Sequence, residues 1–239
     1  MNFVYFASPS TFYRLGGLMA PYFFVLALAS GIAGLYMGLV VAPTDAQQGE
    51  VYRVIFIHVP AAWMSMFIYF VMACYGAMCL TFNTRLAGIM ARALAPTGAL
   101  FTFIALWTGA FWGRPTWGAY WVWDARLTSE LVLLFLYVGY IALANAFEDP
   151  RRGDRAAALL AIIGIVNLPI IYFSVQWWNT LHQGSSVNFR GTSMHVAMLW
   201  GMLLMAFSFW MYSIGVALVR ARTLILDRER RTRWVRAMT

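Results

Sequence analysis

Residues 117–124 of the chain read Trp117-Gly118-Ala119-Tyr120-Trp121-Val122-Trp123-Asp124. This stretch separates two apolar runs, 93–113 and 131–147, so we expect a loop between two membrane spans. Its four aromatic rings cannot all be buried in so short a loop, and clustered exposed rings are typical of a binding surface. Trp and Tyr also collect at membrane interfaces, which makes an aromatic belt the alternative. Because Trp107 and Trp112 lead into the stretch, we favour a binding platform.

The composition indicates an integral membrane protein. Of the 239 residues, 62% are hydrophobic and 11% are charged, whereas soluble domains carry about 25% charged residues. All 17 basic residues are Arg, and they flank apolar runs. Their position fits membrane topology, so the net charge of +8 does not indicate nucleic-acid binding.

Six apolar runs are long enough to cross a bilayer as helices, which takes about 20 residues each. We expect a single all-α membrane domain, a six-transmembrane helix bundle. Its approximate spans are 19–41, 56–80, 93–112, 129–147, 156–175 and 193–218, followed by a basic cytoplasmic tail at 219–239.

The distribution of arginine predicts the orientation of these spans. With the N-terminus inside, 13 Arg residues fall on inner segments and 4 on outer segments. Cytoplasmic segments carry the excess of basic residues in membrane proteins, so we expect both termini in the cytoplasm. The three outer loops are then near 42–55, 113–128 and 176–192, and the Trp-rich stretch lies on the periplasmic side.

Three histidines, His58, His182 and His195, all fall on the expected outer side. A lone histidine at a helix end is usually structural, whereas several on one face beside aromatic rings indicate a ligand set. Haem suits such a set, because its iron accepts axial histidines and its faces need aromatic or apolar cover. We interpret His58 and His182 as two candidate axial ligands and His195 as structural.

Other residues on the outer side supply the remaining parts of a haem site. The rings that can cover the macrocycle are those of Trp117, Tyr120, Trp121 and Trp123. The carboxylates of haem need cations, and the guanidinium fork of Arg matches a carboxylate well. The outer arginines are Arg53, Arg114, Arg126 and Arg190, for which contact with lipid phosphates is the alternative.

Asp124 ends the Trp-rich stretch, and Thr128-Ser129-Glu130 begins the next span. An Asp or Thr at this point is typical of a helix N-cap, and Glu130 suits the positive end of the helix. We therefore expect capping rather than catalysis. The sequence contains no nucleophile–base pair, no phosphate-binding glycine loop and no zinc cluster, so we do not predict an enzyme.

Residues 117–124 are similar to the W-G-x-W-W-x-W-D signature of membrane haem-handling proteins. Two further stretches resemble the surroundings of the haem-ligand histidines in the CcmC family of cytochrome c maturation. They are Ile57-His58-Val59-Pro60-Ala61-Ala62-Trp63 and Thr180-Leu181-His182-Gln183-Gly184. The likeness covers nearly the whole chain. Tyr120 stands where the signature has its second Trp, which preserves stacking and puts a role for an indole N–H there in doubt.

The resemblance implies transient binding of haem b at the periplasmic face of the bacterial inner membrane, with His58 and His182 on the iron. It places the Trp signature, including Gly118 and Asp124, at the site, and we expect Arg53 and Arg126 to serve as its cations. The implied partners are a membrane-anchored CcmE-like haem chaperone, a CcmA-like ATPase, a CcmB-like permease and a small single-span CcmD-like subunit.

Two other functions remain open from the sequence. A b-type cytochrome subunit for electron transfer would hold haem between histidines inside the spans, and only His58 and His195 approach such positions. A transporter permease subunit without a cofactor would use its Trp residues only as membrane anchors. A visible absorption spectrum of the purified protein separates these readings.

Overall fold

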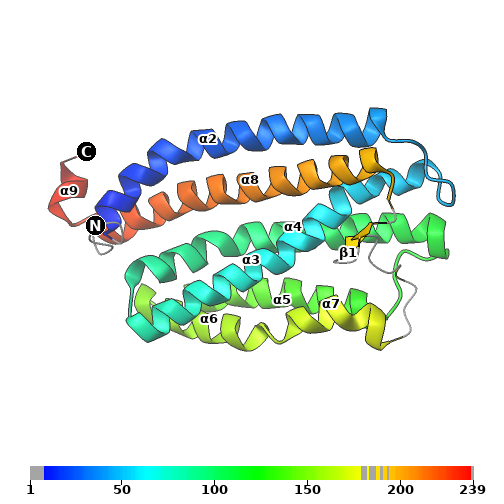
Figure 1. Ribbon diagram of the computed structural model, residues 1–239. Coiled ribbons are helices and arrows are strands. Elements are labelled where there is room, and N and C mark those ends of the chain that lie inside the picture. Colours follow the sequence, from blue (N-terminus) through cyan, green and yellow to red (C-terminus); the bar gives the residue numbers. More distant parts are fainter. Residues whose placement is uncertain (1–7, 179–181, 183–186, 189–190, 193, 238–239) are drawn as a thin grey trace.

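The computed structural model describes residues 8–178, 182, 187–188, 191–192 and 194–237, and it confirms the all-α bundle of six membrane-spanning helices (Figure 1). The chain is a multi-pass membrane protein. Its first elements are α2 (Pro9–Tyr36), the π-helix η1 (Met37–Val41), the 3-10 helix η2 (Glu50–Val54) and α3 (Ile55–Phe82). There follow α4 (Arg85–Trp117), α5 (Ala125–Asn145), α6 (Pro150–Gly164), α7 (Asn167–Trp177), β1 (Val187–Asn188), β2 (Gly191–Thr192), α8 (Val196–Glu229) and α9 (Arg233–Arg236).

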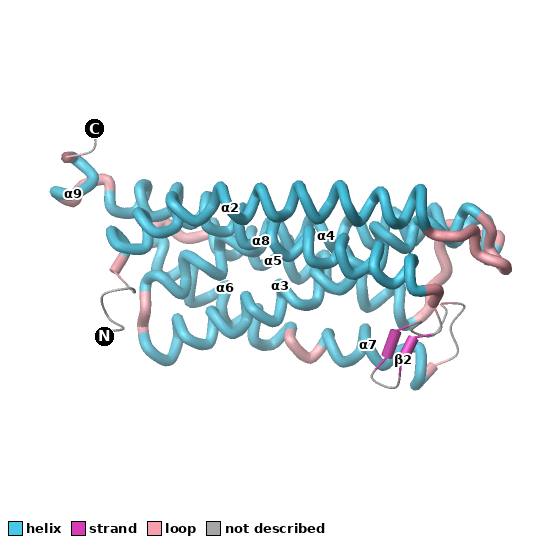
Figure 2. Tube along the Cα trace, turned by 45° about the horizontal axis from the view of Figure 1, so that its top comes forward, coloured by secondary structure: helices cyan, strands magenta, loops and turns pink. Residues whose placement is uncertain are grey.

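The helices run roughly parallel to one long axis, and both ends of the chain lie at the same end of the bundle (Figure 1). The opposite end carries residues 118–124 and the strands β1 and β2, which pair antiparallel next to α7 (Figure 2). We call it the Trp-loop end.

Helix α2 packs along α8, and its other faces are largely exposed (Figure 1). The two helices approach closely at Gly34, where a Cβ atom would lie 2.9 Å from Cγ of Met205 in α8. Gly38 of η1 gives similar room to α3, because a Cβ atom there would lie 2.6 Å from the Phe56 ring. Small residues at such crossings let membrane helices pack backbone to backbone.

The core lies between α3, α4, α5, α6 and α8, and large buried tyrosines fill part of it. Tyr69 and Tyr137 are fully buried, with ring centroids 5.1 Å apart in an edge-to-face arrangement. The hydroxyl of Tyr137 donates to the backbone carbonyl of Ser65 at 2.7 Å. Such a bond removes the cost of burying a phenol.

The end opposite the Trp loop is held by a buried carboxylate. Asp154 of α6 is 3% exposed and accepts two hydrogen bonds from Arg228 of α8, at 2.5 and 2.8 Å. Arg92 of α4 lies 4.0 Å from the same carboxylate and also donates to the carbonyl of Ala144. Three helices therefore meet at one acid.

Several helices are longer than the apolar runs that predicted them. The third span extends to Trp117, so the irregular connection to α5 is residues 118–124 rather than 113–128. Gly118 ends α4 in the left-handed conformation, with φ of 80°, which glycine adopts without strain. Helix α8 continues through Glu229, so the first half of the predicted tail at 219–239 is helical. The expected start of the sixth span at Ser193 lies outside the described residues.

The fifth span is interrupted in the middle and forms two helices, α6 and α7. Pro169 has no N–H to donate to the carbonyl of Ile165, and its ring crowds that turn. Asn167 stabilises the break by donating its side-chain amide to the carbonyl of Ser129 at 2.9 Å. The break therefore packs against the beginning of α5, where Ser129 lies.

Candidate functional site

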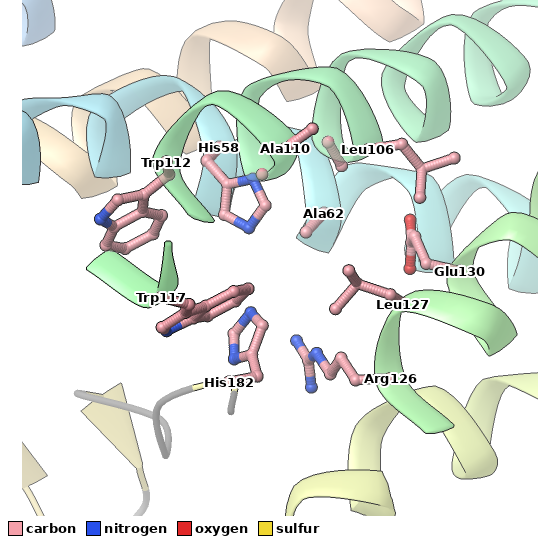
Figure 3. A pocket seen from close by; sticks show the side chains of 12 residues that line it. His58, Ala62, Leu106, Ala110, Trp112, Trp117, Arg126, Leu127, Glu130 and His182 are labelled. Atoms are coloured by element: carbon pink, nitrogen blue, oxygen red, sulfur yellow. The ribbon is translucent and has the colours of Figure 1, made fainter. Parts of the chain in front are cut away.

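A small pocket opens at the Trp-loop end between α3, α4 and α5, and His182 closes it from the segment that follows α7 (Figure 3). Its polar and aromatic wall residues are His58, Trp112, Trp117, Arg126, Glu130 and His182. Of the three histidines in the sequence, the two predicted as iron ligands are therefore the two that line this pocket.

His58 lies in the first turn of α3 and is 9% exposed. Its Nδ1 is 3.1 Å from Oγ1 of Thr108, and that hydroxyl donates to the carbonyl of Ile104 at 2.6 Å. The Thr108 oxygen is therefore the acceptor for the Nδ1 proton of His58. This arrangement leaves Nε2 of His58 unprotonated, which is the form that binds a metal.

Helix α4 shapes the slot that holds the His58 ring. The edge of the Trp112 indole meets the imidazole at a centroid distance of 5.5 Å. A Cβ atom at Gly109 would lie 3.0 Å from Cε1 of His58, so a side chain there would press on the imidazole ring. The first candidate ligand is thus fixed by packing on a rigid helix.

The imidazoles of His58 and His182 face each other across the pocket (Figure 3), with ring centroids 6.3 Å apart and planes inclined by 33°. Metal–imidazole bonds are about 2.0–2.1 Å long, which places two rings that share one metal ion with centroids about 6 Å apart. The pair therefore has the spacing of two axial ligands on one iron.

The enclosed space is about 60 Å³. This volume fits the centre of a flat macrocycle and not its full extent, so a bound haem must reach beyond the pocket or push its walls apart. The donor set suits haem: two imidazoles for the iron, indole faces beside them and one guanidinium for a carboxylate.

The Trp signature is divided between two surfaces. Trp117 occupies the last turn of α4 and lines the pocket, with its ring 6.0 Å from that of His182. Trp121 and Trp123 instead contact each other at 5.3 Å and border an apolar groove between α4 and α5. Leu106 lines both the pocket and this groove, so one side chain separates the two surfaces.

Trp123 is 78% exposed, and Tyr120 is exposed with its ring against Phe111. The guanidinium carbon of Arg114 lies 5.8 Å from the centroid of the Tyr120 ring. The structure thus does not bring Tyr120, Trp121 or Trp123 to the histidine pair. Tyr120 and Trp123 are exposed beside the pocket, and Trp121 is half-buried against Trp123.

Asp124 acts as the N-cap of α5, and its side chain accepts from the backbone N–H of Leu127 at 2.8 Å. The predicted capping role is therefore confirmed. Together with Gly118, Asp124 fixes where the signature leaves one helix and enters the next.

Arg126 is the second residue of α5, and its guanidinium points into the pocket (Figure 3). It donates to the carbonyl of Ile171 in α7 at 3.1 Å. Glu130, one turn further along α5, lines the same pocket and accepts from the hydroxyl of Ser65 at 2.8 Å. From the sequence alone, Glu130 is expected only as a charge at the start of a helix. Its spacing of four residues from Arg126, next to an apolar run, is the signal that places both on one face.

The other predicted cations lie elsewhere. Arg53 donates to the carbonyls of Gly38 at 2.6 Å and Ala42 at 3.2 Å and pairs with Glu50. It is therefore engaged at the end of η1 and does not line the pocket. Arg114 donates to the carbonyl of Gly118 at 2.6 Å. Arg190 lies outside the described residues.

His195 has a structural position, as expected. It is the N-cap of α8, and its Nδ1 accepts from the backbone N–H of Ala197 at 3.2 Å. It does not line the pocket of the other two histidines.

Known proteins resemble this chain over most of its length. The profile of the CcmC family, described as heme exporter protein C, matches residues 2–236. Heme exporter protein C of Escherichia coli K12 is 49% identical over 231 residues, which cover 96% of this chain and 93% of that protein. The Haemophilus influenzae protein of the same name is 45% identical over 234 residues, covering 98% and 95%.

Another relative comes from a plant. A putative cytochrome c biosynthesis ccmC-like mitochondrial protein of Marchantia polymorpha is 45% identical over 193 residues, which cover 81% of this chain and 82% of that protein. The range matched by the family profile, residues 2–236, includes both histidines and the Trp-rich stretch. The chain belongs to the heme exporter protein C family.

Proposed function

We propose that the protein binds haem b transiently between His58 and His182 and presents it to a membrane-anchored haem chaperone during c-type cytochrome maturation. The observation that carries this proposal is the facing imidazole pair, with centroids 6.3 Å apart. The name shared by the bacterial relatives, heme exporter protein C, supports haem as the cargo.

In this proposal the pocket residues have separate tasks. His58, held by Thr108, is the fixed axial ligand, and His182 is the second ligand. Trp117 covers the macrocycle next to His182. Arg126 neutralises one carboxylate of haem, because its guanidinium points into the pocket (Figure 3). When haem is bound, it supplies the iron that the two imidazoles hold; the protein itself catalyses no reaction on it.

We assign the hand-off to the exposed part of the Trp signature. Trp123 is 78% exposed, and Trp121 contacts it edge to face. Exposed aromatic clusters are frequent at protein interfaces. A CcmE-like chaperone that docks here would lie next to the haem pocket, because Leu106 borders both the pocket and the groove of Trp121 and Trp123. The complex would also contain CcmA-like ATPase, CcmB-like permease and CcmD-like subunits.

The membrane and orientation belong to the same proposal. We place the protein in the bacterial inner membrane, with both termini cytoplasmic and the Trp-loop end in the periplasm, on the basis of the 13 inner and 4 outer arginines. In this orientation haem is held on the periplasmic side of the membrane, where the chaperone would receive it.

The test is the visible spectrum of protein purified from haem-replete cells, for the wild type and for His58→Ala, His182→Ala and His195→Ala. We expect a low-spin spectrum with two nitrogen ligands in the wild type, its loss in the first two variants and its retention in the third. His195→Ala is the matched control because it removes an imidazole outside the pocket. A spectrum that depends on His195 alone would overturn the assignment.

The two alternative functions give different results in the same experiment. An electron-transfer subunit would retain haem stably and reduce it with quinol, without passing it to a chaperone. A permease without a cofactor would show no Soret band even when the chaperone is absent. The position of the histidine pair at one end of the bundle, rather than at mid-depth, favours presentation over electron transfer.

A further inference from the structure

Glu130 is an acid buried inside a membrane-spanning helix. It lies in the second turn of α5 and is 8% exposed. A carboxylate in such a place is costly unless other groups stabilise it, and ionisable residues inside membrane spans usually mark functional sites. The cost is reduced by the hydroxyl of Ser65, 2.8 Å from Oε1 of Glu130, and by the positive N-terminal end of the helix.

The support of Glu130 comes from the packed core and not from the pocket. Ser65 is fully buried in α3, and its backbone carbonyl accepts from the hydroxyl of Tyr137 at 2.7 Å. These contacts fix the carboxylate on the pocket wall opposite His182 (Figure 3). Glu130 therefore has a fixed position on the wall of the site.

Arg126 is the positive charge that faces this acid. The two residues are four apart on α5, so their side chains lie on the same face of the helix, and both line the pocket. In the described part of the chain Arg126 forms no ion pair within 4.0 Å, and its hydrogen bond goes to the carbonyl of Ile171. A guanidinium has five N–H donors, so several remain for a ligand.

We propose that Glu130 is a built-in counter-charge that limits how tightly Arg126 holds a carboxylate of the cargo. This inference rests on the proposed function. Without cargo, the charges of Arg126 and Glu130 offset each other, and the bond to the carbonyl of Ile171 keeps Arg126 in position. When a haem carboxylate arrives, two carboxylates share one guanidinium, and they repel each other. Affinity is thereby kept low enough for haem to leave, as presentation to a partner requires.

The decisive variant is Glu130→Gln, which preserves shape and can still accept a bond from Ser65. The probes are haem and haem dimethyl ester, which has the same macrocycle without carboxylates. For haem we expect about tenfold tighter binding and correspondingly slower release than in the wild type, since one opposing charge is removed from a desolvated site. Binding of the ester should not change. Glu130→Asp, which retains the charge, should behave like the wild type.

A second measurement covers the case in which Glu130→Gln does not insert. In Arg126→Gln the acid remains without its counter-charge, so the ester should bind more tightly than haem. Equal affinity for the two probes in this variant would contradict the proposal.

The outcomes also separate this inference from the proposed function. If the wild type binds neither haem nor the ester, both the proposed function and the counter-charge proposal are contradicted. If binding requires His58 and His182 but Glu130→Gln weakens both probes equally, or leaves haem affinity unchanged, only the counter-charge fails and Glu130 is structural.

Discussion

Trp112 donates its indole N–H to the side-chain oxygen of Gln48 across 2.7 Å, and the same ring packs edge-on against His58. Gln48 belongs to the connection between η1 and η2, where Asp45 accepts from its backbone N–H at 2.8 Å. A loop outside the pocket is therefore bonded to the residue that packs against His58, the first candidate iron ligand.

Gln48→Ala should loosen this tie. A hydrogen bond of this kind contributes about 0.5–1.5 kcal/mol, so we expect a small loss of stability and a broadened haem spectrum as the Trp112 ring gains freedom. The measurement is thermal unfolding in detergent, combined with the absorption spectrum. Gln47→Ala is the matched control, because no side-chain bond of Gln47 holds Trp112. Equal effects of the two changes would contradict the role of the bond.

Thr108→Val should weaken iron binding at His58 without disturbing the fold. The change keeps the shape of the side chain and removes the acceptor for the Nδ1 proton. Loss of such a partner typically costs about 10–100-fold in metal affinity. Haem titration would measure it, and Thr108→Ser should restore most of the affinity. Wild-type affinity in the Val variant would show that the bond does not orient the ring.

The Trp signature should divide into two functional classes. Trp117→Ala should lower haem binding, because Trp117 lines the pocket beside His182. Trp121→Ala and Trp123→Ala should leave binding intact and reduce transfer to the chaperone. Trp→Phe should be milder at each position, since a ring keeps the apolar face. Haem-loaded chaperone per unit of inserted protein is the readout. If a variant with Ala at 117, 121 and 123 inserts normally and still loads the chaperone like the wild type, the binding-platform hypothesis is contradicted and the aromatic belt remains.

Two Arg–Asp pairs at the other end of the bundle offer a matched comparison of stability. Arg228→Gln leaves Asp154 buried without its two-point partner, and such a change costs about 3–5 kcal/mol. Arg152→Gln removes an exposed partner 3.9 Å from Asp149 and should cost about 0–1 kcal/mol. Denaturant unfolding in detergent measures both. Similar losses for the two would contradict the burial argument.

A reporter fused after Thr239 should be active in the cytoplasm. The expectation follows from the excess of arginine on the segments that share a side with the C-terminus. A second reporter inserted into the 118–124 connection should be active only in the periplasm. The reverse pattern would place the histidine pocket on the cytoplasmic side and remove the basis for presentation to a periplasmic chaperone.

Much of this architecture is readable from the sequence, because span length and arginine placement are local signals. The six spans, the pocket position of His58 and His182 and the cap at Asp124 follow from such signals. The extent of the helices beyond their apolar cores does not, because caps such as Gly118 decide it.

Hydrogen-bond partners that are distant in the sequence cannot be predicted in this way. Arg53 resembles a free cation in the sequence, yet it bonds carbonyls 15 and 11 residues earlier in the chain. Glu130 resembles a helix-end charge, yet Ser65, 65 residues away, fixes it at the pocket. Neither assignment can be made without the packing of α2, α3 and α5.

The break at Pro169 makes the two proposed iron ligands unequal. His58 is embedded in a continuous helix and packs against Thr108, Gly109 and Trp112. His182 lies between α7, a short helix separated from α6 by the interruption, and the paired strands β1 and β2. A shift of α7 about the break would therefore move His182 and leave His58 in place. A partner that shifted α7 would change the distance between the two imidazoles, and so would control whether both can hold one haem.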